Sequence, residues 1–311
     1  MRSKCIVLKT VLGIAFLFAA GCQTPMSGEA WAVRPASLVV DAGERQLLVH
    51  RSDDVPYKPY VQVLRSPVGV NILRDAPADH LHHHGLMYAV TVDGVDYWAE
   101  TEQAGQQVVR RTRAAAPTKI AGWWRSGFIQ SICWVPPRDE NISLIEERTI
   151  TAWQGDDLDA SLISWNTQLA VPECRPTREL SGERYFGLGM RFVESMDKGG
   201  TFYNADGATG VAGTNNVRSP WCAYTAAADG HTVTVAMFDH PANLRHPSYW
   251  FTMDDAFAYM SNTPGVHHEK ITIKRGTPLS YRFGVAVWDG EVASDRVQAL
   301  YERWVKIEGG K

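Results

Sequence analysis

Alternating apolar and polar residues, rich in β-branched and aromatic side chains, recur along most of the chain after residue 36. Alternation with a period of two is typical of strands that bury one face. The segments with this pattern are 37–41, 46–50, 59–64, 86–93, 127–135, 142–153, 159–171, 231–238 and 279–288. Because several of them reach 9 to 13 residues, they suit broad packed sheets. The pattern therefore predicts an all-β chain built as a large antiparallel β-sandwich.

One segment near the end has the period of a helix instead. Residues 291–306 place four apolar side chains, Val297, Leu300, Tyr301 and Trp304, on one face and charged residues on the other. Such a pattern predicts an amphipathic helix whose apolar face is buried. We expect this C-terminal helix to close a sheet edge or to pack under the sandwich.

The first 22 residues have the pattern of an export signal. Three basic residues precede the apolar run 11–20, which is too short to span a bilayer, and the run ends at a cysteine, Cys22. The segment Ala19–Cys22 resembles a bacterial lipobox, which implies cleavage before Cys22 and lipid on that cysteine. We expect a lipoprotein signal peptide (1–21), a tether (22–34) and a single β-sandwich domain (35–311), anchored to the cell envelope by lipid alone.

Charge and cysteine content exclude some classes of function. Residues 1–21 contain three basic and no acidic side chains, so 28 basic against 34 acidic residues remain, a net charge of −6. Nucleic-acid binding needs clustered basic charge, so we expect no nucleic-acid partner. Beyond Cys22, the cysteines Cys133, Cys174 and Cys222 form no closely spaced pair, which argues against a thiolate zinc site.

The densest chemical signal is the run DHLHHHGL at 79–86, which contains four of the ten histidines: His80, His82, His83 and His84. Imidazole transfers protons near neutral pH and is also the commonest transition-metal ligand. In extended backbone His80, His82 and His84 would share one face, and His80 with His82 could hold a metal ion. The run on its own leaves three interpretations open: proton transfer or sugar-hydroxyl binding, a metal site, or a structural hydrogen-bonded cluster.

A second polar and aromatic patch follows at 239–250. Asp239 could orient His240, with Asn243 and Trp250 nearby. The chain has eleven tryptophans, and an indole such as Trp98 or Trp250 can stack on the apolar face of a sugar while polar groups bind its hydroxyls. The alternative is that these tryptophans belong to the core. No nucleophile elbow or glycine-rich phosphate loop occurs.

Five sequence blocks, taken in order, resemble those of a bacterial family known as PmoA-like, or methane oxygenase PmoA. The matching blocks are DHLHHHGLMYAVTVDGVDYW (79–98), GLGMR (187–191), NADG (204–207), SPWCAY (219–224) and FDHPANLRHPSYWF (238–251). The resemblance covers roughly residues 35–305. A genuine methane monooxygenase subunit is a multi-helix membrane protein, whereas no run of 18 apolar residues occurs here, so we interpret the label as a misassignment. The β-rich pattern looks closer to the galactose mutarotase-like supersandwich, which presents polar residues to a sugar.

Carried over position by position, the resemblance implies functional roles for His80, His82, His83, Gly85, Arg191, Asp239, His240, Asn243 and Trp250. The chain departs from the family pattern twice: His84 stands where relatives carry arginine, and Phe186 stands where they carry glutamate.

We therefore expect an exported carbohydrate-active enzyme, an epimerase, lyase or hydrolase that acts on a small-molecule or glycan ligand. The residues assigned to catalysis are His82, His83, Arg191, Asp239 and His240, and those assigned to substrate binding are His80, Trp98, Asn243 and Trp250. His82 or His83 would act as acid or base, and Arg191 would stabilise oxyanion charge.

Two alternatives stay open: a non-catalytic carbohydrate-binding lipoprotein, and a copper or zinc oxidoreductase-like protein with His80 and His82 as ligands. Outside that last alternative no cofactor is expected. The oligomeric state is left open.

Overall fold

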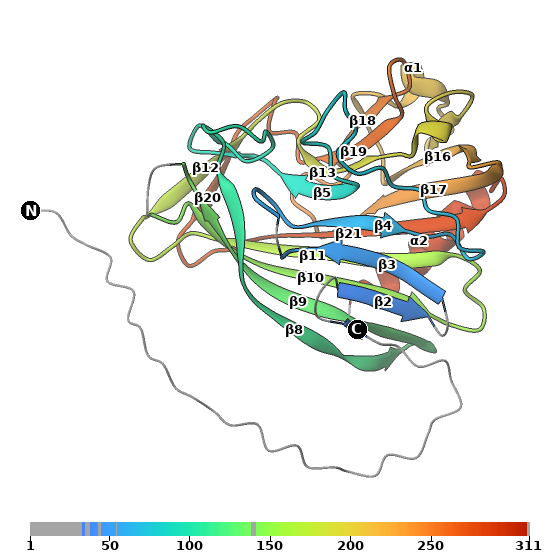
Figure 1. Ribbon diagram of the computed structural model, residues 1–311, viewed down its shortest axis with the longest axis horizontal. Helices are drawn as coiled ribbons and strands as arrows, with labels where there is room; N and C mark the ends of the chain where they lie inside the picture. Colours follow the sequence, from blue (N-terminus) through green and yellow to red (C-terminus); the bar gives the residue numbers. More distant parts are fainter. Residues whose placement is uncertain (1–32, 35–37, 43–44, 54, 138–140, 310–311) are drawn as a thin grey trace, which may run out of the picture.

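The computed structural model describes residues 33–34, 38–42, 45–53, 55–137 and 141–309. Within them the strands form three sheets in which every pairing is antiparallel (Figure 1). The predicted signal peptide with Cys22, and the predicted tether apart from Val33–Arg34, lie outside the described residues. Among the described residues, no helix has the length and apolar character needed to cross a membrane.

The largest sheet has nine strands. In spatial order they are β1 (Val33–Arg34), β2 (Leu38–Ala42), β3 (Arg45–Arg51), β4 (Tyr60–Leu64), β5 (Leu86–Ala89), β13 (Gly187–Arg191), β19 (Tyr259–Thr263), β18 (Tyr249–Met253) and β15 (Val217–Arg218). Strands far apart in sequence therefore lie side by side at its centre, where β13 pairs with both β5 and β19.

The second sheet has eight strands, which are longer. In spatial order they are β14 (Thr201–Asn204), β16 (Trp221–Ala228), β17 (His231–Asp239), β21 (Leu279–Asp289), β11 (Ser161–Ala170), β10 (Leu144–Gln154), β9 (Trp123–Val135) and β8 (Gln106–Ile120). A small third sheet, at the left in Figure 1, consists of β20 (Ile271–Lys274), β12 (Thr177–Ser181), β6 (Thr91–Val92) and β7 (Val95–Asp96).

The two large sheets pack face to face around one hydrophobic core. Tyr88 of β5 meets Trp134 of β9 and Phe283 of β21, with ring centroids 6.3 and 6.4 Å apart. His50 of β3 meets Phe128 of β9 at 4.9 Å. The predicted antiparallel β-sandwich is confirmed, and its core also includes side chains of the third sheet.

Helix α2 (Ser294–Glu308) covers the other face of the eight-stranded sheet (Figure 1). Its buried residues Val297, Tyr301, Trp304 and Ile307 form a second apolar cluster with residues of β17, β21 and neighbouring strands. This confirms the predicted C-terminal helix, which packs on the face of the sheet. Two shorter helical segments, the 3-10 turn Glu194–Met196 and α1 (Gly210–Thr214), join strands.

The nine-stranded sheet also has an outer face, directed away from the eight-stranded sheet. Residues that pair directly across antiparallel strands share a face. Arg191 pairs with Tyr259, and Tyr259 pairs with Met253, so these three form one row. Leu188 pairs with Tyr88, whose ring meets Trp134 and Phe283 of the eight-stranded sheet, so Leu188 faces that sheet. Arg191, three residues further along the strand, faces the opposite way, and the row therefore lies on the outer face.

Candidate functional site

The histidine run forms two consecutive tight turns. The backbone N–H of His80 donates to the carbonyl of Pro77, and that of His83 donates to the carbonyl of His80, both at 2.9 Å. The expectation of an extended run, with His80, His82 and His84 on one face, is therefore wrong. A tight turn brings residues three apart together, so His80 stacks on His83 with ring centroids 4.6 Å apart, and His82 meets His83 at the same separation.

These three histidines line a pocket of about 370 Å³ on the outer face of the nine-stranded sheet. We call it the histidine pocket, and its lining consists of His80, His82, His83, Arg184, Tyr185, Phe251, Met253, Phe257 and Tyr259. Its volume falls in the range of small-molecule sites, and aromatic walls with a few polar groups are typical of them.

Two glycines make the pocket wall possible. A side chain on Gly189 of β13 would overlap the hydroxyl of Tyr259 and lie 3.2 Å from Trp98, so only glycine lets both aromatic rings lie against the strand. Gly85 follows the histidine run with φ of 39°, and a Cβ there would collide with the carbonyl of Val61. Glycine adopts this conformation at little cost, which lets the turns lead directly into β5.

A chain of charged groups fixes His80. The Nδ1–H of His80 donates to the Oδ2 atom of Asp79 at 2.9 Å, and Nη2 of Arg191 donates to the same oxygen at 3.0 Å. Although desolvation alone would raise the pKa of Asp79, these two hydrogen bonds hold it at about 2. Asp79 is therefore ionised at neutral pH and orients the His80 ring, as carboxylates do for catalytic histidines.

Arg191 itself lies behind the pocket wall. Its guanidinium carbon is 3.4 Å from the ring centroid of Phe257, and the side chain is almost fully buried. Arg191 was expected to stabilise oxyanion charge, and in the structure its charged partner is the carboxylate of Asp79. Its Nε and Nη1 atoms are buried and have no hydrogen-bond partner among the described residues.

His82 and His83 are neutral at physiological pH. Burial, reinforced by the neighbouring His82, His80 and Arg191, lowers the pKa of His83 to about 2. Burial, followed by the charge of Lys58, also lowers the pKa of His82. A neutral imidazole has one donor and one acceptor, which suits hydroxyl groups. The Nδ1 atom of His83 is buried and has no partner among the described residues.

His84 turns away from the pocket and lies between two carboxylates. Its Nδ1 donates to Asp75 at 2.6 Å and its Nε2 donates to Glu100 at 3.0 Å. Because carboxylates only accept, both ring nitrogens carry hydrogen and His84 is an imidazolium. Burial alone would lower the pKa of His84, but its bonds to Asp75 and Glu100 raise it. A cation thus stands where the family pattern quoted above has arginine.

Trp98, which was expected to bind substrate, stacks on Phe186, which stands where the family pattern has glutamate. Trp98 and Phe186 lie parallel, with ring centroids 5.0 Å apart and planes at 11°. Both are buried, and Trp98 reaches the His83 ring only by its edge, at 6.3 Å. Trp98 therefore supports the pocket wall from behind, and Phe186 places an aromatic ring where the family pattern has a carboxylate.

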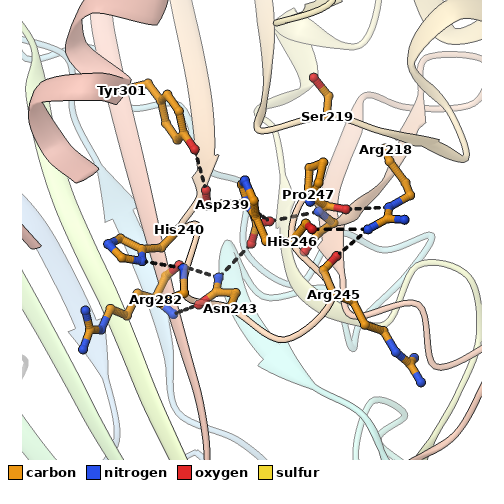
Figure 2. A network of polar contacts seen from close by, with 12 residues as sticks. Arg218, Ser219, Asp239, His240, Asn243, Arg245, His246, Pro247, Arg282 and Tyr301 are labelled. Carbon is orange, nitrogen blue, oxygen red and sulfur yellow. Dashed lines mark hydrogen bonds and ion pairs between the residues drawn. The ribbon is translucent and has the colours of Figure 1, made fainter. Parts of the chain in front are cut away.

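Within the second predicted patch (239–250), residues 239–248 form a separate network that we call the Asp239 loop (Figure 2). The fully buried Asp239 accepts from Asn243 Nδ2 at 2.7 Å, from His246 Nδ1 at 2.7 Å and from the backbone N–H of Ser248 at 2.9 Å. The Nδ2 of Asn243 also donates to the carbonyl of Arg282 at 2.8 Å. Every partner of the carboxylate is part of the chain.

His240 and Trp250 also lie outside the histidine pocket. The Nδ1 of His240 accepts from the backbone of Ala242 at 3.0 Å, and its ring meets Trp304 of α2 at 5.6 Å. Trp250 is buried in the core and donates to the carbonyl of Ser219 at 2.8 Å. The structure thus brings together His80, His82 and His83, with Arg191 and Trp98 behind them. It places Asp239, His240, Asn243 and Trp250 elsewhere.

Six lining residues were absent from the sequence interpretation: Arg184, Tyr185, Phe251, Met253, Phe257 and Tyr259. One signal for them existed. Trp250, which was expected to bind substrate, belongs to β18. Its neighbour Phe251 faces the opposite side of the strand and lines the pocket, so the sequence indicated the right strand but the wrong face of it. No motif marks Arg184 or Phe257, because their positions depend on loop geometry.

The three pocket histidines do not fit a shared metal ion. The rings of His80 and His83 are stacked with 17° between their planes, so their in-plane lone pairs do not converge on one point. In addition, Nδ1 of His80 is engaged by Asp79. No group of three or more His, Cys, Asp or Glu side chains within the described part of the chain is placed to hold a metal.

Comparison with known proteins gives matches of structure but no curated relative. A galactosidase domain of an α-galactosidase–sucrose kinase, AgaSK, is 7% identical over 78% of this chain and 39% of that one, with a TM-score of 0.45. The GH36 α-galactosidase AgaA from Geobacillus stearothermophilus is 8% identical over 65% and 30%, with a TM-score of 0.37. The chain thus spans less than half the length of either. No curated protein matches. A family model described as a family of unknown function (DUF6807) matches residues 37–302, and the chain belongs to that family.

Proposed function

We propose that the histidine pocket is the active site of a carbohydrate-active enzyme in which His80 transfers a proton to or from the bound sugar. The observation that carries this proposal is the chain Arg191–Asp79–His80. A buried cation fixes a carboxylate, and the carboxylate fixes one nitrogen of an imidazole that lines the pocket. Such a pair sets the tautomer and orientation of the ring, so that the other nitrogen can act as acid or base.

The rest of the lining supports a sugar as the bound molecule. A sugar ring has an apolar face that stacks on aromatic rings such as Phe257 and Tyr259, and a rim of hydroxyls. His82 and His83 are neutral and can both donate to and accept from those hydroxyls. In this proposal His80 is the catalytic residue, and Asp79 and Arg191 are positioning residues. An epimerase, a lyase and a hydrolase all need such a proton transfer.

Turnover of a sugar panel by purified protein tests the proposal. Monosaccharides and oligosaccharides, neutral and acidic, would be incubated with the protein, and products and C–H exchange in D₂O would be followed by NMR. We expect His80→Asn to lower the turnover rate about 100-fold or more, the usual contribution of a general acid or base. His231→Asn, at an exposed histidine of β17, is the matched control. Unchanged turnover by His80→Asn would refute the assignment.

A non-catalytic sugar-binding protein is the second candidate, and one observation favours it. Phe186 occupies the position of the family glutamate and stacks on Trp98, and no carboxylate lines the histidine pocket. Under this alternative the same panel gives saturable quenching of tryptophan fluorescence with no product. The His80→Asn variant would then change affinity alone.

We also propose that the protein is exported and lipid-anchored through Cys22, since the segment before it has the pattern of a lipoprotein signal. Metabolic labelling with a palmitate analogue tests this. Labelled wild-type protein in the membrane fraction and unlabelled Cys22→Ala are the expected results. Label retained by Cys22→Ala would contradict the proposal.

A further inference from the structure

We infer that the histidine pocket selects acidic sugars, and that Arg184 binds their oxyanion group. The inference rests on the proposed function in one respect, the sugar-binding role of the pocket, and adds the substrate class. It starts from the one permanently charged side chain in the lining.

Arg184 differs from the other arginines around the site. Arg191 is paired with Asp79, and Arg74 with Glu194 and Asp197. Arg184, by contrast, has no carboxylate within ion-pair distance among the described residues. Its guanidinium instead lies over the ring of Phe251, 5.3 Å from the centroid, and the residue is exposed. An aromatic ring orients a guanidinium without satisfying its N–H donors, so they stay available to a ligand.

The electrostatics of the lining point the same way. None of the nine lining residues is acidic, and Arg184 contributes a positive charge. The one carboxylate of the histidine run, Asp79, is ionised, and the positive charge of Arg191 compensates it. Arg184 is the one permanently charged group in the lining of this concave site, where it attracts anions and disfavours cations, an effect that salt weakens because Arg184 is exposed.

The loop beside Arg184, residues 264–269, carries one carboxylate, Glu269, which is paired with Arg245. Both ring nitrogens of His267 are shielded and have no partner among the described residues. Burial, then the neighbouring His268 and the charge of Arg184, lower the pKa of His267, which places it near Arg184 as a neutral group.

The geometry therefore matches a ligand with two parts. The aromatic walls and neutral histidines suit the sugar ring, and the free fork of Arg184 suits a planar carboxylate, which it can bind through two parallel hydrogen bonds. A uronic acid has this combination. Phosphate and sulfate esters of sugars share the oxyanion chemistry and differ in shape and charge.

Binding measurements distinguish carboxylated, phosphorylated and sulfated sugars from one another and from neutral sugars. The quenching of tryptophan fluorescence would be titrated with glucuronate or galacturonate, with glucose or galactose, with glucose 6-phosphate and with glucose 6-sulfate. We expect at least one acidic sugar to bind about tenfold or more tightly than its neutral parent, the effect of a charge-assisted hydrogen bond. Arg184→Gln should abolish that preference, so that the acidic sugar and its neutral parent bind with similar affinity. Arg113→Gln, which removes the same charge from an exposed position of β8, should leave the preference intact.

The outcomes separate this inference from the proposed function. Equal binding of acidic and neutral sugars, or a preference that survives in Arg184→Gln, overturns the inference while sugar turnover would still support the proposed function. An Arg184-dependent preference without turnover supports the inference and contradicts the catalytic role. If no sugar of the panel binds, both are overturned.

Discussion

Two regions of this protein contain the same residue types and use them in opposite ways. The histidine pocket and the Asp239 loop each combine an aspartate, histidines and arginines. In the Asp239 loop the chain supplies the partners of the carboxylate: Asn243, His246 and Ser248 donate to it, and Arg218 donates to the carbonyls of residues 245–247 (Figure 2). This network fixes a loop.

In the histidine pocket, polar atoms are left over. Nδ1 of His83, the hydroxyl of Tyr259 and two nitrogens of Arg191 are buried and have no partner among the described residues. Buried polar groups are usually hydrogen-bonded, and those that are not mark a functional site or bound solvent. The Asp239 loop also leaves buried polar atoms without a partner, Nε2 of His240 and Oγ of Ser248. The two regions differ in their aspartates: Asp239 is fully buried and accepts from three donors of its own loop, whereas the side chain of Asp79 is 43% exposed and orients a ring that lines a pocket. Motif composition alone does not separate a structural network from a binding site.

Replacing Asp239 with alanine tests the structural half of this comparison and should have the largest effect. The substitution removes a fully buried acceptor shared by three donors and leaves a cavity, so we expect a loss of about 3–5 kcal/mol in the free energy of unfolding. Urea denaturation followed by tryptophan fluorescence measures it. Asp206→Ala, at an exposed turn, should stay within about 0.5 kcal/mol of the wild type. A small stability loss combined with abolished sugar binding would place the Asp239 loop in the site.

His84 sharpens the comparison, because it belongs to the histidine run yet is satisfied by the chain. Removing its charge in His84→Ala leaves Asp75 and Glu100 facing each other, and we expect a loss of about 1–3 kcal/mol in stability at pH 6. His84→Arg should recover part of it. Because the pKa of His84 is raised in the folded state, its contribution is complete below about pH 6.5 and is lost as pH rises through the raised pKa.

The measurement is the difference in unfolding free energy between wild type and His84→Ala at pH 6 and at pH 9. A difference that shrinks at pH 9 agrees with the imidazolium. A constant difference would mean that His84 contributes through packing on Tyr60, whose ring lies 4.4 Å away.

Much of the fold could be predicted from the sequence, because burial on one face imposes a period of two. The long strands β10 and β11 follow this rule and were predicted. Strand β8 was missed because most of its residues, including a run of arginines, are exposed on both faces at the edge of the sheet. An edge strand of this kind has no apolar period to detect.

The site could be predicted only in part. The histidine run is visible in the sequence, but its turns are not. His80 and His82 share one side as expected, whereas His83 joins them in the pocket and His84 does not. Asp79 stood in the quoted motif without a role, because its partner Arg191 is 112 residues away. Arg184 and Phe257 lie in loops, where neither period nor motif fixes the direction of a side chain.

The third prediction concerns the buried His83 of the histidine pocket and has the smallest expected effect. It is tested by measuring the free energy of unfolding as the pH is lowered. The pKa of His83 is about 2 in the folded state and that of an ordinary histidine, about 6.5, in the unfolded state. Between these values the unfolded state therefore binds one more proton than the folded state. Stability from this group is therefore complete above pH 6.5 and falls as pH is lowered, by about 1.4 kcal/mol per pH unit at most.

Between pH 7 and pH 5, unfolding by urea should thus show a shallower loss of stability for His83→Gln than for the wild type. His231→Gln should follow the wild-type slope, because His231 is exposed. If His83→Gln also follows the wild-type slope, His83 takes up a proton in the folded state as easily as a surface histidine. Its ring would then already be solvated, and the most buried histidine of the pocket would not be an unsatisfied polar group.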